Sequence, residues 1–258
     1  MLFDLQGKRK RFIQIVYALL AALFLISFVG FGIGSDAAGG IFDAFGLGSN
    51  SSGTSNPEYE QEIEDAEARL DQDPKNERAL LDLARIHFLA AQNEFEQDES
   101  GATVVTEDAQ VELEASADAW QRYLALDPSK PDGGVALQLG AVYDTLMRSA
   151  AQSDPQALPG ILEEGEATAR IAAEQQPSAN TYLTWAQFAY FAGDTKAGDE
   201  AAKKLLAEVD SAQRKSAGRQ LEQLEKTGEQ IDEFVKESAP GKEALTNPLL
   251  GESAAPTP

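Results

Sequence analysis

The sequence contains no cysteine and only one histidine, His87, among its 258 residues. Without cysteine the chain can form neither a disulfide, nor a thiolate metal site, nor a catalytic thiol, nor the acylated cysteine of a lipoprotein. A single histidine also excludes the metal spacings that need histidine pairs. His87 falls at a helix-packing position, so we predict that it belongs to the core rather than to chemistry.

Catalytic and cofactor-binding motifs are also missing from the sequence. The glycine pairs near the N-terminus lie in or beside an apolar run rather than after a strand, so they form no phosphate-binding loop. No serine occurs in the pattern of a nucleophile elbow. We therefore predict that the protein is not an enzyme, that it has no catalytic residue, and that it binds no cofactor and no metal.

Positive charge is scarce, because 21 Lys and Arg stand against 43 Asp and Glu, giving a net charge of −22 at pH 7. Residues 1–34 carry four cations and one acid, so the rest of the chain carries −25. Such a surface repels nucleic acid and anionic lipid headgroups, which makes both poor partners. Solubility is its simplest role, and recruitment of a basic partner is the alternative.

One long apolar run is present, at residues 12–34, and four cations at residues 8–11 directly precede it. At about 1.5 Å per residue the run spans roughly 34 Å, which is enough to cross the hydrocarbon core of a bilayer. The next cation is Arg69, and this asymmetry places the N-terminus in the cytoplasm. We predict a cytoplasmic basic tail (1–11), a single transmembrane helix (12–34) and an extracytoplasmic remainder. A cleaved signal peptide is the alternative, although its apolar core is normally about 7 to 15 residues long.

Two segments lack a sustained hydrophobic period. Residues 35–56 are rich in Gly and Ser and are predicted to form a tether. They hold one apolar cluster, which we expect in the outer membrane interface: Ile41, Phe42, Phe45 and Leu47. Residues 239–258 contain several Pro and Gly and are predicted to be a disordered tail.

Between these segments the pattern is helical throughout. Ala, Leu, Glu, Gln and Arg dominate, and apolar positions recur at intervals of three and four. Breaks are indicated where Pro follows Asp or Gln and at Gly193-Asp194, and Thr106 is a good N-cap. The predicted helices are 57–72, 76–96, 106–126, 132–150, 160–176, 178–192, 195–208 and 211–237. The fold class is therefore all-α.

The helices recur in pairs with a common spacing of small and large residues. First helices share one pattern, in Leu80, Leu83, Ala84 and His87; in Ala136, Leu139, Gly140 and Tyr143; and in Tyr182, Trp185, Ala186 and Ala189. Second helices share another, in Ser116, Trp120, Tyr123 and Pro128; in Gly165, Ala169, Ala172 and Pro177; and in Gly198, Ala202 and Leu205. This arrangement resembles the tetratricopeptide repeat (TPR) family over residues 57–210, as a half-repeat followed by three repeats.

The resemblance implies an α-solenoid of stacked helical hairpins, in which the small residue at Gly140 lets the first helix of a pair approach the second. Residues 211–238 are then a capping helix with a polar outer face, and a coiled-coil partner surface is the alternative. The chain departs from the family in length, because Pro74 to Pro128 is 54 residues and Pro128 to Pro177 is 49, against about 34 in the family. The excess falls near residues 92–110 and 149–162.

In this family the first helices line a concave groove that binds peptides. Carried over residue by residue, the groove candidates are Arg78, Leu81, Arg85, Phe88, Leu89, Leu137, Gln138, Ala141, Asp144, Asn180, Leu183, Gln187, Tyr190 and Phe191. The clamp that some members use for a peptide carboxylate is absent, since Leu81 and Arg85 stand where its Lys and Asn would be. The aromatic residues and arginines suggest a peptide held by apolar contact, and packing of Phe88 and Phe191 in the core is the alternative.

These observations lead to one expected function and two alternatives. The expected protein is anchored in the membrane of a bacterial cell envelope and acts there as a protein-interaction scaffold or chaperone-like adaptor. Its architecture is similar to that of anchored repeat proteins that assist the translocon. One alternative is an assembly factor for a membrane complex, such as a cytochrome maturation subunit. The other is a structural envelope spacer whose groove is empty. The partner is a protein or peptide that the sequence does not identify.

Overall fold

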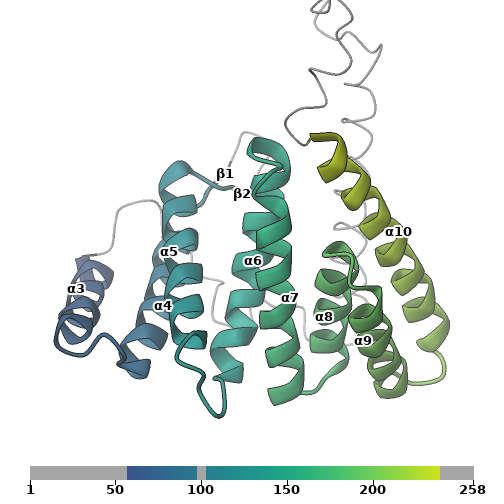
Figure 1. Ribbon diagram of the computed structural model, residues 1–258, viewed down its shortest axis with the longest axis horizontal. Helices are drawn as coiled ribbons and strands as arrows, with labels where there is room; N and C mark the ends of the chain where they lie inside the picture. Colours follow the sequence, from purple (N-terminus) through teal and green to yellow (C-terminus); the bar gives the residue numbers. More distant parts are fainter. Residues whose placement is uncertain (1–56, 98–102, 239–258) are drawn as a thin grey trace, which may run out of the picture.

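The computed structural model describes residues 57–97 and 103–238, and these fold as a single row of α-helices (Figure 1). The helices are α3 (Pro57–Gln72), α4 (Glu77–Asn93), α5 (Glu107–Leu124), α6 (Gly133–Ser153), α7 (Leu158–Gln175), α8 (Ala179–Phe191), α9 (Thr195–Glu208) and α10 (Arg214–Ser238). All eight were predicted, each within three residues at both ends, and the all-α class is confirmed. Within the described ranges no helix is long and apolar enough to span a bilayer. The predicted tail, transmembrane helix and tether (1–56) and the C-terminal tail (239–258) lie outside the described residues.

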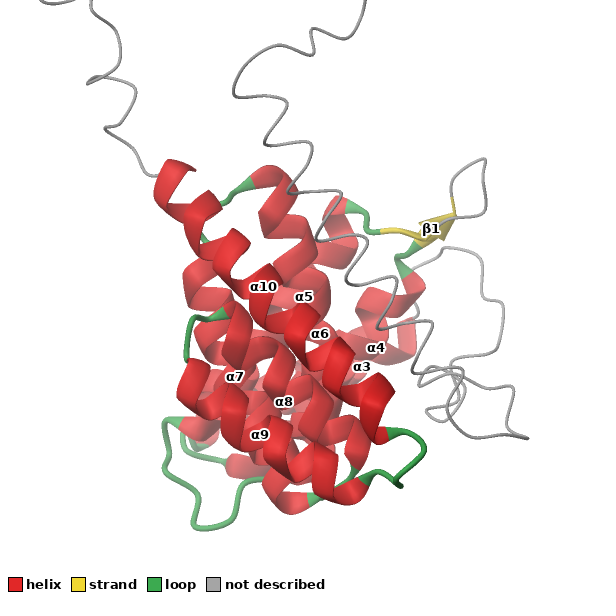
Figure 2. Ribbon diagram, turned by 90° about the vertical axis from the view of Figure 1, so that its right-hand side faces the viewer, coloured by secondary structure: helices red, strands yellow, loops and turns green. Residues whose placement is uncertain are grey.

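The helices pack as three hairpins between two single helices. α4 packs on α5, α6 on α7, and α8 on α9, while α3 covers α4 at one end and α10 covers α8 and α9 at the other. Successive hairpins join mainly where α5 meets α6 and α7 meets α8. Seen from the α10 end, α4 and α6 lie toward one side and α7 and α9 toward the other (Figure 2). The first helices of the hairpins are neighbours, because α4 packs on α6 and Gln187 of α8 donates a hydrogen bond to Asp144 of α6, and we call α4, α6 and α8 the first-helix layer.

Polar side chains set where the helices begin. Thr106 accepts a hydrogen bond from the backbone N–H of Ala109 (3.0 Å), which confirms the predicted N-cap of α5. Three caps that were not predicted serve the first-helix layer: Asn76 for α4, Asp132 for α6 and Ser178 for α8. Each satisfies backbone donors that a helix leaves unpaired in its first turn.

The repeated positions form the core. Of the aligned residues in the three hairpins, all are buried except His87, Pro128 and Tyr182, which are partly buried, and Pro177, which is exposed. The small positions allow close contact, as where the hydroxyl of Ser116 donates to the backbone oxygen of Ala84 at 2.7 Å. Two indole rings are held by polar side chains of a neighbouring helix, because Trp120 donates to Thr168 (2.9 Å) and Trp185 donates to Glu166 (2.9 Å).

The glycines that permit close approach differ from the one predicted. A Cβ on Gly140 would lie 3.9 Å from the Thr184 methyl group of α8, so this glycine faces the next hairpin and has room for a methyl group. A Cβ on Gly165 would lie 2.6 Å from the ring of Phe188, and one on Gly198 would lie 2.5 Å from the ring of Tyr190. The aromatic rings of α8 therefore rest on glycines of α7 and α9.

The length in excess of the family repeat takes two forms. Between α4 and α5 the chain forms a small antiparallel sheet of β1 (Glu96–Gln97) and β2 (Thr103–Val104), which was not predicted. The β-branched run Thr103-Val104-Val105 is the signal that favours a strand there. Between α6 and α7 the excess is used to lengthen helices, since α6 continues to Ser153 and α7 begins at Leu158.

Candidate binding face on the first-helix layer

Three leucines occupy the same repeat position on successive first helices. Leu81 on α4, Leu137 on α6 and Leu183 on α8 each directly follow the first aligned residue of their hairpin. All three are partly buried and pack against the core from its edge, so each keeps part of its side chain exposed. We call them the leucine row. Because α4 packs on α6 and Gly140 of α6 faces Thr184 of α8, the row crosses adjacent helices.

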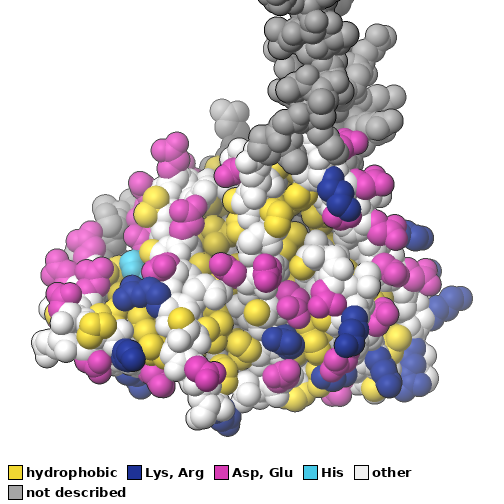
Figure 3. Space-filling model, in the orientation of Figure 1, with side chains coloured by type: hydrophobic (Ala, Val, Ile, Leu, Met, Phe, Trp, Pro, Cys, Tyr) yellow, Lys and Arg dark blue, Asp and Glu magenta, His cyan; other side chains and the backbone are white. Residues whose placement is uncertain are grey.

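The charge of the first-helix layer is balanced, unlike that of α3, α5 and α7. Helices α4, α6 and α8 together carry three arginines and three acids. Helices α3, α5 and α7 carry three arginines and sixteen acids. Figure 3 shows acidic side chains gathered over the α3 end of the molecule. An acidic segment therefore meets less repulsion at the first-helix layer than at α3, α5 or α7.

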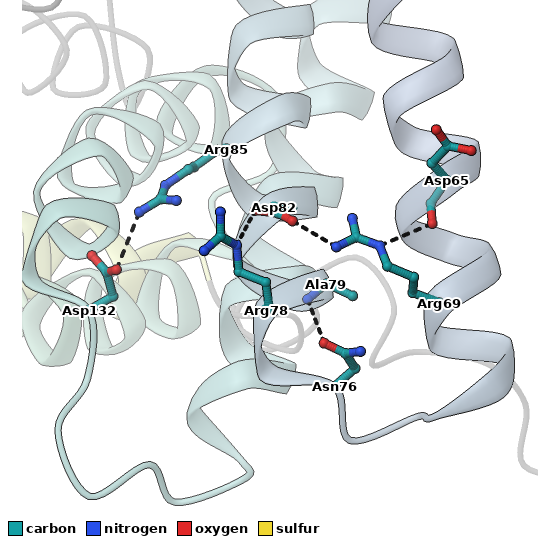
Figure 4. Close-up of polar contacts among 8 residues, drawn as sticks. All are labelled: Asp65, Arg69, Asn76, Arg78, Ala79, Asp82, Arg85 and Asp132. Atoms are coloured by element: carbon teal, nitrogen blue, oxygen red, sulfur yellow. Dashed lines mark hydrogen bonds and ion pairs between the residues drawn. The ribbon is translucent and has the colours of Figure 1, made fainter.

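Two of the predicted arginines lie at the α4 end of this layer, and both are paired with acids. Asp82 receives Arg69 from α3 at 2.9 Å and Arg78 from its own helix at 3.1 Å. Arg85 lies 3.3 Å from Asp132, in the loop that precedes α6 (Figure 4). The side chains of Arg85 and Asp132 are about one third exposed (36% and 35%), and such pairs contribute only about 0–1 kcal/mol. Arg85 is thus within reach of an incoming carboxylate.

Asp144 joins α6 to α8. It pairs with Arg148 one turn later on α6 and accepts a hydrogen bond from the amide of Gln187 at 3.2 Å. Burial raises the pKa of Asp144 above the ordinary value of 3.8, while Arg148 and Gln187 act in the opposite direction. The structure therefore brings two predicted groove residues together, as a polar link between neighbouring first helices.

The predicted aromatic residues are placed differently from the expectation. Phe88, Tyr190 and Phe191 have 6%, 5% and 2% of their surface exposed, so they belong to the core and leave the binding face. The ring of Tyr190 lies on Gly198 and its hydroxyl donates to Asp199 of α9, which turns it toward the second helix of its own hairpin. Gln187 is also buried (5%).

The other predicted residues remain at the surface to different degrees. Arg78 and Asn180 are exposed. Eight are partly buried: Leu81, Arg85, Leu89, Leu137, Gln138, Ala141, Asp144 and Leu183. Sequence reasoning listed every member of the leucine row but gave the aromatic residues the main role. The equal register of the three leucines was the signal that distinguished them.

A second region with several titratable groups lies between α3, α4 and α5. The imidazole Nδ1 of His87 is 2.7 Å from a carboxylate oxygen of Glu112, and the histidine side chain is 15% exposed. Glu112 also lines a small pocket with Tyr59, Glu60, Ile63, Ala90, Asn93 and Glu94. Among the described residues no group of His, Asp or Glu is arranged to hold a metal ion. His87 is at the edge of the core with a polar partner, rather than enclosed by apolar neighbours as the packing prediction implied.

Comparison of the chain with protein-family models, with curated proteins and with solved structures found no match.

Proposed function

We propose that this chain is a membrane-anchored, TPR-like scaffold that binds an extended apolar segment of a partner protein across its first-helix layer. The leucine row carries the proposal. Three apolar side chains in equal register, on adjacent helices and in a neutral surrounding, offer a repeated contact to a chain that crosses the helices. The anchor and the extracytoplasmic placement rest on the apolar run at 12–34 and on the cations before it.

The spacing of the row suits an extended ligand. Packed helices lie about 8–10 Å apart, and a chain in the polyproline II conformation has three residues per turn and rises about 3.1 Å per residue. Apolar side chains three residues apart in the ligand therefore meet successive leucines. Gln138 and Asn180 lie beside the row on α6 and α8 and supply amides that can pair with the ligand backbone. This mode of recognition needs no catalytic group, so we assign the chain a binding role.

Site-specific photo-crosslinking in intact cells tests this function directly. A photoreactive residue at Gln138 should give adducts with one or a few defined membrane or extracytoplasmic proteins. The same residue at Arg170, which is exposed on α7 in the opposite layer, should not. Replacing Leu81 and Leu183 by serine should reduce the adducts by about tenfold or more, since each 1.4 kcal/mol of lost contact is a factor of ten.

A matched control separates loss of binding from loss of folding. Leu124 on α5 and Leu206 on α9 are also partly buried leucines at the edge of the core, but on second helices. Leu124→Ser with Leu206→Ser should lower the melting temperature by a similar amount and leave the adducts at position 138 in place. Equal adduct yield at 138 and 170, or loss of adducts in the control alone, refutes binding at the first-helix layer.

A further inference from the structure

We propose that the leucine row is occupied, when no partner is bound, by residues 41–47 of the same chain. This segment contains Ile41, Phe42, Phe45 and Leu47 around a single charged residue, Asp43. It lies outside the described residues, and the inference rests on the proposed function of the first-helix layer. The segment then acts as an internal competitor that a partner must displace.

The spacing of the segment matches the spacing of the row. Phe42 and Phe45 are three residues apart, and Ile41, Ala44 and Leu47 follow at the same interval. In the polyproline II conformation, residues at this interval lie on one face of the chain and about 9 Å apart, which is the separation of packed helices. Ile41, Ala44 and Leu47 thus extend over three successive helices, and the row presents one leucine on each of α4, α6 and α8.

The connecting chain is long enough to allow this contact. Nine residues, 48–56, separate Leu47 from the first residue of α3, and at up to about 3.3 Å per residue they reach roughly 30 Å. α3 has 16 residues and a length of about 24 Å, and its first residue lies at the opposite end of this helix from the α3–α4 turn (Figure 1). Leu81 lies in the second turn of α4. The distance from the first residue of α3 to the row is therefore less than the roughly 30 Å that residues 48–56 can span, and the segment can reach the row.

The charges favour the same docking site. Residues 35–56 contain Asp36 and Asp43 and no cation. Helices α3, α5 and α7, with their sixteen acids, repel this segment, whereas the first-helix layer offers Arg78 and Arg85. Among the described residues, Arg85 is paired with Asp132 at 3.3 Å, so Asp43 can share or replace that partner. A short tether also gives an effective concentration in the millimolar range, which lets a weak intramolecular contact compete with a partner.

Photo-crosslinking of the full-length chain in native membranes tests the occupant. A photoreactive phenylalanine analogue at Phe45 should form an intramolecular adduct with α4 or α6, located by peptide mass spectrometry. Leu137→Ser should reduce this adduct severalfold, while Leu206→Ser should not. The same analogue at Ser52 in the connecting residues is the control for mere proximity, and its adducts should not respond to Leu137→Ser.

Other occupants give distinct results, each of which overturns the inference. Adducts of Phe45 with lipid alone place the segment in the membrane interface. Adducts between isotopically distinct copies indicate a second chain, and adducts with α5 or α7 indicate the acidic face. If an analogue at Leu137 reacts with residues 239–258 instead, the C-terminal tail is the occupant.

A second pair of variants distinguishes this inference from the function on which it rests. With Phe42→Asp and Phe45→Asp, partner adducts at Gln138 should rise at least threefold, because the competitor is removed. Unchanged partner adducts overturn the internal competitor and leave the binding function intact. If Phe45 crosslinks to the leucine row but Gln138 captures no partner in either chain, the internal contact stands and the proposed function fails.

Discussion

Gly228 of α10 passes so close to α8 that a Cβ on it would lie 2.1 Å from the backbone oxygen of Tyr190. The helix that ends the array is therefore in direct contact with the backbone of the last first helix. Leu221, Leu224 and Ile231 on the same side of α10 are buried, and its other side is polar and exposed. The capping helix depends on this one position without a side chain.

Gly228→Ala should destabilise the protein. The added methyl group meets backbone rather than a flexible side chain, so α10 must shift away from α8 and lose part of its buried surface. Overpacking of this kind costs about 1–3 kcal/mol, and chemical denaturation measures it. Gly218→Ala is the matched control, because no atom lies within 4 Å of a Cβ at that position of the same helix. The control should gain up to about 1 kcal/mol from helix propensity. Equal stability of the two variants contradicts the close crossing.

A similar comparison locates the tight contact between the second and third hairpins. Gly165→Ala should cost about 1–3 kcal/mol, because the new Cβ would lie 2.6 Å from the ring of Phe188, which is fully buried. Gly140→Ala should be neutral or stabilising, since its Cβ would make an ordinary contact of 3.9 Å with Thr184. Thermal unfolding measures the difference in stability between the two variants. If Gly140→Ala loses more stability than Gly165→Ala, the close contact lies at Gly140, as the family resemblance predicted.

The hydrogen bond between Trp120 and Thr168 links α5 to α7, and both residues are fully buried. Thr168→Val keeps the shape of the side chain but removes the acceptor, so the buried indole N–H is left without its partner. We expect a loss of about 1–3 kcal/mol in the free energy of unfolding. Thr145→Val is the control, because Thr145 is only partly buried and its hydroxyl donates to the Ala141 carbonyl of its own helix. If both variants lose the same amount, the link between the hairpins contributes nothing specific.

The helices were predictable because their signals are local. Apolar residues at intervals of three and four, Pro after Asp, and Thr106 at an N-cap each act within a few residues, and the observed helices follow them. The turn at Gly193 was also indicated, and its φ of 80° explains why glycine ends α8 there. The strands β1 and β2 were missed, since two residues in each are too few to show an alternating pattern.

The binding face was harder to predict because it depends on which way each side chain turns. Repeat alignment places Phe88, Asp144 and Tyr190 at one equivalent position. Asp144 remains partly exposed, whereas Tyr190 turns onto Gly198 and Phe88 enters the core. Large aromatic side chains gain more from burial than an acid does, so a shared position does not give a shared environment. The leucines, which are smaller, stay at the edge of the core.

The membrane topology remains a prediction from the sequence alone. Protease added to intact spheroplasts should degrade residues beyond about 50 and leave the N-terminal tail protected, because the cations at 8–11 keep that end in the cytoplasm. Moving these four cations to the far side of residues 12–34 should weaken or invert the orientation. Resistance of the helical domain until the cells are lysed would contradict the predicted topology.

Asp144 should make folding stability depend on pH in a direction opposite to that of an ordinary paired acid. Because burial raises its pKa in the folded state, the native protein keeps this proton at a pH where the unfolded chain has lost it. The stabilisation is complete below the unfolded pKa and is lost as pH rises through the folded value. Asp144→Asn cannot ionise, so its stability relative to the wild type should rise between about pH 3.8 and the folded pKa.

The matched control is Asp118→Asn on α5. Asp118 also pairs with an arginine four residues later, but its side chain is 68% exposed. Urea titrations at stepped pH measure the stability of each variant relative to the wild type. If the two variants respond alike, the ion pair with Arg148 rather than burial governs Asp144.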